Sequence, residues 1–99
     1  MLREITILTQ EDLTNIEHWA ELKFSLSEIA TMLMVDVGQL RLALQTPKSD
    51  IAIAYNAGKL KSMVQRRETI LKAANKGAQW AIELLDKYEI HQREDELMP

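Results

Sequence analysis

The stretch that decides the fold is "SLSEIATMLMVDVGQLRLAL", residues 25–44, which contains two helix starts separated by a turn. Ser25 is followed three residues later by Glu28. This is the spacing of a capping box, in which each side chain bonds the backbone amide of the other residue. A second start follows at Asp36, whose carboxylate can cap another helix. The stretch therefore predicts two short helices around a tight turn.

The apolar residues of this stretch recur at the spacing of a helix-turn-helix motif. Ala30 is small enough to let the next helix cross closely, and apolar side chains on both sides of the turn can fix the crossing angle. These side chains are Ile29, Leu33, Leu40 and Leu44. Many such motifs have glycine where this chain has Met34. The backbone there must avoid the left-handed conformation or adopt it at an energetic cost.

The composition favours helix nearly throughout. The chain has 99 residues, of which 46% are hydrophobic, with only three Gly and two Pro, and it is rich in good helix formers. That length suits one compact domain, or a small domain with a helical arm. The absence of cysteine excludes disulfides and thiolate metal sites, and it fits a reducing compartment. We expect an all-α protein.

Helix signals continue on both sides of the central stretch. Thr9 with Asp12 predicts a helix start, and that helix runs to about Lys23. Pro47 ends the third helix near Gln45. A long apolar stripe over residues 51–75, the stop signal "NKG" at 75–77 and a further apolar stripe predict two more helices, the last giving way to the charged end "EIHQREDELMP". For residues 1–8, an added strand, a packing arm and a frayed end all stay open.

These signals predict three regions. Residues 9–46 form an N-terminal three-helix helix-turn-helix head, residues 47–91 a long antiparallel helical hairpin for oligomerisation, and residues 92–99 a flexible acidic tail. A helix of about 25 residues reaches roughly 37 Å, which is more than a three-helix head needs, and the short connection at Gly77 favours a hairpin. The surplus apolar surface suggests self-association. The alternative is that the head covers it.

Charge is distributed unevenly along the chain. The net charge is −4 over residues 1–46, +4 over residues 47–67 and −3 over residues 68–99. The positive segment holds Lys48, Lys59, Lys61, Arg66 and Arg67. Such segregation is typical of an electrostatic footprint for nucleic acid, and the plainer alternative is a solvated helix face.

The third helix of the head is the candidate DNA reader. The side chains that suit base edges or phosphates are Gln39, Arg41, Gln45 and, just beyond the helix, Lys48. Lys59 and Arg66, seven residues apart, can add backbone contacts from nearly one face of the long helix. Val37 and Leu42 could at most contact thymine methyl groups. The alternative is a third helix that binds protein.

Three segments resemble the small terminase subunits of tailed bacteriophages. The stretch "LTQEDLTNIEHWAELKFSLSEIATMLMVD" resembles their N-terminal helix-turn-helix, "IAIAYNAGKLKSMVQRRETILKAANKG" their following helix with an A-Y-x-x-G-K pattern, and "AQWAIELLDKY" their closing helix. Together they span about residues 9–90. Members of that family form rings through the helices after the head, bind the phage packaging site and regulate a separate large subunit that carries the ATPase and nuclease.

The resemblance implies a DNA-binding adaptor that recognises phage DNA and regulates a packaging motor. Its partners would be double-stranded DNA, further copies of itself in a homo-oligomer such as a ring, and a large terminase subunit. The implied location is the cytoplasm of a bacterial host. No apolar run approaches the roughly 18 to 20 residues of a membrane span, so we expect no membrane association.

Two other functions stay open, namely a small dimeric helix-turn-helix transcriptional regulator and a helical structural module that binds no DNA. We do not expect an enzyme or a cofactor. Glu17 and His18 on the first helix, and His91 near Glu94, lack a recognisable metal or nucleophile pattern. The three glycines stand apart from one another, so they form no phosphate-binding loop.

Overall fold

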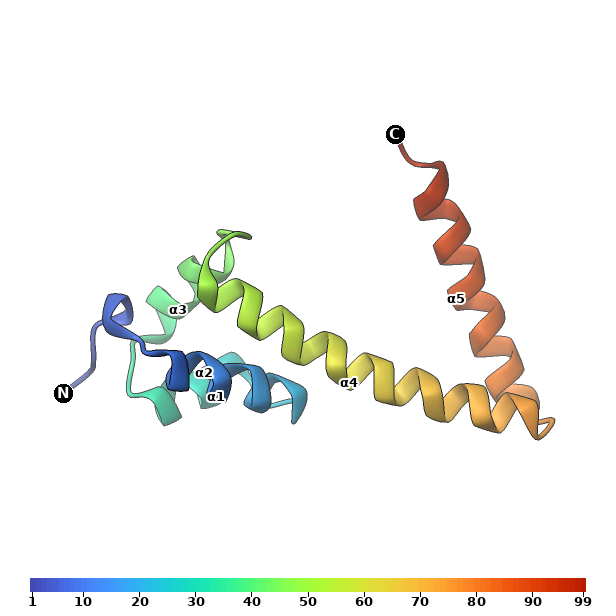
Figure 1. Ribbon diagram of the computed structural model, residues 1–99, viewed down its shortest axis with the longest axis horizontal. Helices are drawn as coiled ribbons and strands as arrows, with labels where there is room; N and C mark the ends of the chain where they lie inside the picture. The colour runs from blue at the N-terminus through green and yellow to red at the C-terminus, as the bar shows by residue number, and fades with distance from the viewer. The chain divides into compact units, whose positions relative to one another are not determined.

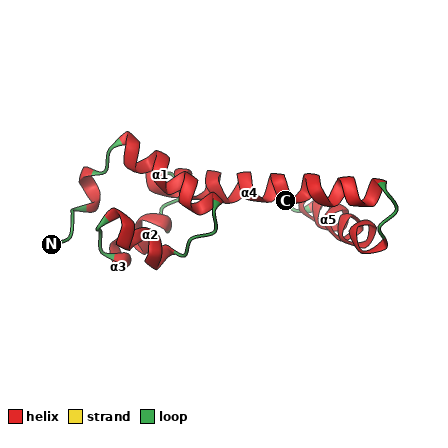
Figure 2. Ribbon diagram, turned by 90° about the horizontal axis from the view of Figure 1, so that it is seen from below, coloured by secondary structure: helices red, strands yellow, loops and turns green.

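The computed structural model describes residues 1–99 and is all-helical, as expected (Figures 1 and 2). A short 3-10 helix, η1 (Ile5–Ile7), precedes α1 (Gln10–Glu21), α2 (Leu26–Leu33), α3 (Val37–Leu44), α4 (Asp50–Asn75) and α5 (Gln79–Leu97). The chain divides into two compact units, Met1–Ser62 and Met63–Pro99, so α4 contributes its first half to one unit and its second half to the other. None of the helices combines the length and apolar character that a membrane span requires.

Side-chain caps set the helix starts at the expected residues. At α1, Thr9 Oγ1 accepts from the Asp12 amide at 3.2 Å and the Asp12 carboxylate accepts from the Thr9 amide at 2.8 Å. Ser25 and Glu28 form the same reciprocal pair at α2, at 3.2 and 2.9 Å. Asp36 accepts from the amide three residues later, at 3.0 Å, and so caps α3. These bonds satisfy amides that have no partner within the helix.

Three helices end in the same backbone turn, in which an amide beyond the helix donates five residues back. These bonds join Phe24 N to Trp19 O, Val35 N to Ala30 O and Ala78 N to Ala73 O, at 3.1, 3.0 and 3.1 Å. Each turn needs one left-handed residue, and these are Lys23 (φ 71°), Met34 (φ 61°) and Gly77 (φ 89°). Met34 therefore adopts the left-handed conformation, at the cost that a side chain incurs there.

The core of the first unit is built mainly by α1, α2 and α3. Its largest fully buried side chains are Ile16, Ile29, Leu33 and Leu40. Ala30 is 3% exposed, as expected of a small residue where α2 meets its neighbours. Ile5 and Leu8 pack against this core. Residues 1–8 are therefore a packing arm that contains η1, which settles the choice left open by the sequence.

A glycine brings α4 close to α1 within the first unit. A Cβ atom added to Gly58 would overlap the Glu17 carbonyl oxygen and lie 2.8 Å from Ala20 Cβ. Glycine inside a helix costs stability, and here it permits a backbone-to-backbone approach that no other residue allows. One turn further along α4, Lys61 Nζ bonds the Glu17 carboxylate at 2.7 Å.

The second unit consists of the second half of α4 and of α5. Its buried residues, Ile70 and Ala81, lie within about two turns of the Gly77 turn, whereas Val64 and Ile90 are 54% and 53% exposed. The two helices thus bury side chains mainly near the turn, whereas the expected hairpin would bury them along its full length.

The final helix also extends to Leu97, well beyond the point where it was expected to end. Charge did not stop it, because Glu and Arg are good helix formers. The Arg93 guanidinium also bonds the Glu89 carboxylate at 2.9 Å across one helical turn.

Met34→Gly is expected to raise the free energy of unfolding by about 1 kcal/mol, because glycine adopts the left-handed conformation without a Cβ penalty. The control is Met32→Gly, two residues earlier inside α2, which should lower it by about 0.5–1 kcal/mol through the cost of glycine within a helix. Urea unfolding followed by circular dichroism measures both. If Met34→Gly also destabilises, the left-handed conformation at this residue carries no cost.

Gly58→Ala is expected to lower the free energy of unfolding by about 1–3 kcal/mol, since the new methyl group overpacks the contact between α1 and α4. Asn56→Ala, at an exposed position of the same helix, should leave it unchanged or raise it slightly, because alanine is the better helix former. Thermal unfolding of the two variants measures the difference. An equal or higher midpoint for Gly58→Ala would contradict the close approach.

Candidate nucleic-acid interface

Helix α3 presents one side to the core and the other to solvent. Leu40 is 1% exposed, and Val37, Ala43 and Leu44 pack partly buried against the same core. The middle of the outward side is formed by Gly38 and Leu42, and Leu42 is 63% exposed there. A helix held on one side and bare on the other is the arrangement that a reading helix requires.

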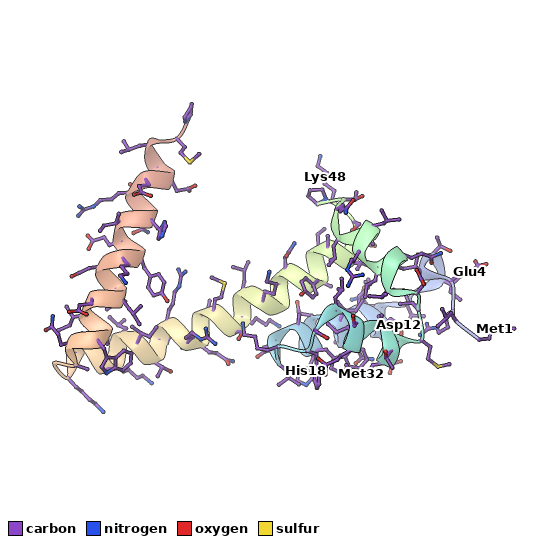
Figure 3. The ribbon with its side chains drawn as sticks, turned by 180° about the vertical axis from the view of Figure 1, so that it is seen from behind. Met1, Glu4, Asp12, His18, Met32 and Lys48 are labelled. Atoms are coloured by element: carbon purple, nitrogen blue, oxygen red, sulfur yellow. The ribbon has the colours of Figure 1, made fainter.

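The structure places the expected site residues of α3 on this outward side, but on different flanks. Arg41 and Gln45 lie one helical turn apart and share a flank, whereas Gln39 lies on the opposite flank. All three are exposed. Lys48 follows in the loop between α3 and α4, is exposed, and points away from the head (Figure 3).

Charge distinguishes the two flanks. Gln39 lies next to the α3 cap, where its backbone amide donates to the Asp36 carboxylate, and that negative charge disfavours phosphate nearby. Arg41 and Lys48 form no ion pair within the protein. The flank that begins at Arg41 and continues through Gln45 toward Lys48 is therefore the side of α3 that suits an anionic partner. We call Arg41, Gln45 and Lys48 the basic flank.

The basic residues of α4 do not act as one patch. In the first unit, Lys61 is paired with Glu17, and the bond raises the pKa of the Lys61 ammonium above its usual value. Lys59 Nζ lies 5.6 Å from the centre of the Tyr55 ring, within the range of a cation–π contact, and stays exposed.

The second unit holds the other two arginines of the basic segment. Arg67 is stacked over Tyr88, 4.3 Å from the ring centre. Arg66 is exposed and unpaired. Of the two α4 residues expected to contact the DNA backbone, Lys59 thus lies in the first unit and Arg66 in the second.

Sequence reasoning missed the contacts that Arg3 makes with α1 and with the turn before α3. Its guanidinium donates to both Asp12 carboxylate oxygens, at 2.7 and 3.2 Å, and to the Leu33 carbonyl at 3.2 Å. Its backbone amide donates to the Met34 carbonyl at 2.6 Å. The partners lie 9 and about 30 residues away in sequence, so no local pattern could have revealed them. We call these four contacts the Arg3 clamp.

The clamp changes the acidity of its carboxylate. The Arg3 hydrogen bonds, followed by those from Thr9, lower the pKa of Asp12 from 3.8 to about 2. Asp12 is 13% exposed and the Arg3 side chain 34%, so the pair is partly shielded from water. Asp12 therefore has two roles, since it completes the α1 capping box and also binds the arm.

No group of three His, Cys, Asp or Glu side chains in the chain is close enough to hold a metal ion. Comparison with protein-family models, curated proteins and solved structures finds no match.

The Asp12 pKa predicts how stability changes in acid. A carboxylate with a lowered folded-state pKa contributes its full stabilisation above the unfolded pKa and loses it as the pH falls. Stability should therefore decrease between about pH 4 and about pH 2 as Asp12 is protonated. Urea unfolding across this range should show a smaller decrease for Asp12→Asn than for the wild type. Glu11→Gln, in the same helical turn, should retain the wild-type decrease. Identical curves for Asp12→Asn and the wild type would contradict the assignment.

Proposed function

We propose that this chain is a non-catalytic DNA-binding adaptor similar to the small terminase subunits. In this proposal, residues 9–46 are a helix-turn-helix head in which α2 supports α3 as the reading helix. Residues 47–91 are the oligomerisation arm, folded as a helical hairpin. Copies would recognise phage DNA together and regulate a separate packaging motor, a large terminase subunit.

The observation that carries the proposal is the basic flank of α3. It combines a helix held by the core on its inner side with an outer flank that exposes Arg41 and Gln45, and the loop that follows exposes Lys48. Arginine and glutamine are residues that bind base edges, and lysine neutralises phosphate. The fit of Ala30 against its neighbours and the tight turn at Met34 support the same interpretation.

The small number of available cations argues for many weak contacts. Along α3, the loop after it and the first half of α4, only three cations are exposed and lack a carboxylate partner. They are Arg41, Lys48 and Lys59. Since affinity for DNA comes largely from neutralised phosphates, one head should bind poorly. Several heads on one assembly would bind far more tightly, because each later contact becomes intramolecular.

Exposed apolar side chains supply a reason for self-association. Along α4, Leu60 is 59% exposed and Leu71 is 49% exposed, and on α5 Trp80 is 57% exposed. Large apolar side chains left in water in this number are typical of surfaces that bind another protein chain. Further copies of the same chain are the partners that avidity requires.

Leu42 is the observation that favours the second candidate, a helical module that binds protein and not DNA. It is the most exposed of the large apolar residues in the head helices, and it stands between the two polar flanks of α3. A dimeric transcriptional regulator shares the DNA contacts of the main proposal and differs in assembly. Multi-angle light scattering separates these cases, because a large closed oligomer supports the packaging adaptor, whereas a dimer supports the regulator and a monomer removes the avidity.

The DNA contact is tested with Arg41→Ala. Loss of one arginine contact to a base or phosphate should weaken binding by about 1–3 kcal/mol, roughly 5- to 150-fold, in fluorescence anisotropy with duplex DNA at fixed salt. Lys23→Ala removes the same charge from the turn after α1 and should change affinity little. Equal affinity of Arg41→Ala and the wild type would exclude α3 as the DNA surface.

A further inference from the structure

We infer that Arg3 is a positioning residue, which holds α3 in the orientation that DNA binding requires without contacting DNA itself. The inference rests on the proposed function for its DNA readout, and it concerns a part of the chain outside the helix-turn-helix region.

Arg3 joins two places that sequence keeps far apart. Its guanidinium holds Asp12 in the first turn of α1, and its guanidinium and backbone amide together hold the carbonyls of Leu33 and Met34. Those two carbonyls lie between the end of α2 and the start of α3. Arg3 also forms an isolated parallel β-bridge with Val35, which is 3% exposed. The segment from which α3 departs is therefore fixed to α1 through one residue.

The turn between α2 and α3 needs this support. Both helices have only eight residues, and helices of that length are marginal by themselves. The turn between them places Met34 in the left-handed conformation, which favours its opening. The last carbonyls of a helix lack partners within it, and a cation at that end is stabilising. Arg3 holds this turn closed, bonds the carbonyls of Leu33 and Met34, and places a cation at the end of α2.

The charge of Arg3 is already neutralised. The Asp12 carboxylate faces the guanidinium at 2.7 Å, and the bond raises the pKa of Arg3 above its usual value. A planar guanidinium can hold a carboxylate with two parallel bonds, which a lysine ammonium cannot do. A cation bound in this way contributes little attraction for phosphate. The orientation of α3, and not direct contact, is the route by which Arg3 affects DNA.

A positioning role and a direct phosphate contact of Arg3 predict opposite effects of Asp12→Asn on DNA affinity. If Arg3 positions α3, Arg3→Met and Asp12→Asn both weaken DNA binding, by about 2- to 30-fold. The slope of log affinity against log salt then stays at the wild-type value for Arg3→Met. If Arg3 contacts phosphate, Arg3→Met reduces that slope by about one, and Asp12→Asn strengthens binding by releasing the guanidinium. Either of these last two results overturns the inference.

Matched variants isolate the effect in fluorescence anisotropy titrations with duplex DNA. Glu11→Gln removes one negative charge beside Asp12 without touching the clamp, and it should leave affinity unchanged or raise it. Arg3→Lys keeps the positive charge but loses the planar guanidinium that makes two parallel bonds to Asp12. Its affinity should therefore lie between those of the wild type and Arg3→Met. Wild-type affinity for Arg3→Lys would show that the two parallel bonds of the guanidinium are not needed. All titrations are made at a temperature at which circular dichroism shows every variant to be folded. Arg3→Met leaves Thr9 and Asp12 unchanged, so the α1 capping box stays intact.

Amide hydrogen exchange tests the clamp without DNA. In Arg3→Met, the amides of Met34 and Val35 should exchange several-fold faster than in the wild type. The amides of Lys23 and Phe24 form the same backbone turn after α1 without any contact from Arg3, and they should be unchanged. Equal acceleration at both turns, or none at Met34, overturns the inference. If the wild type binds no DNA, the proposed function fails, while the exchange result still decides whether Arg3 holds the turn.

Discussion

The backbone turn at Met34 determines the direction in which α3 leaves α2, and the candidate interface depends on that direction. The turn brings Val35 into the core and allows Leu40 to be buried from the next helix. With Leu40 fixed inward, helical geometry leaves Arg41 and Gln45 on the outward side. A different angle at Met34 would expose Leu40 and bury the polar flank. The side chains that α3 presents to solvent are therefore set by one residue in the left-handed conformation and by the contacts that hold it.

Those contacts come from outside the helices that they orient. Arg3 reaches the turn from the N-terminal arm, and Asp12 links the arm to α1. On another side of α1, Gly58 and Lys61 fix the first half of α4 at Glu17. α1 is thus the element to which both the turn and α4 are attached. A change on α1 is therefore expected to alter the orientation of α3 and of the first half of α4.

Local signals in the sequence predicted the helices well, because caps and apolar spacing act over three or four residues. The boxes at Thr9 and Ser25 and the cap at Asp36 each formed where expected. The end of α5 was wrong because charge was taken as a sign of disorder, although Glu89 and Arg93 stabilise helix at that spacing. The reason for Gly58 and the role of Arg3 could not be predicted, since each depends on a partner far away in sequence.

The same limit applies to the electrostatics. The five basic residues in the segment 47–67 suggested an electrostatic footprint, but tertiary contacts give them different environments. Glu17 neutralises Lys61, and Tyr88 holds Arg67 in a different unit from Lys59. Along α3, the loop after it and the first half of α4, the exposed cations without a carboxylate partner are Arg41, Lys48 and Lys59. This surface could therefore neutralise at most about three phosphates, which corresponds to a log–log slope of about −2.7. Under the proposed function, a steeper measured dependence would require cations beyond these three, and several heads acting on one DNA would supply them.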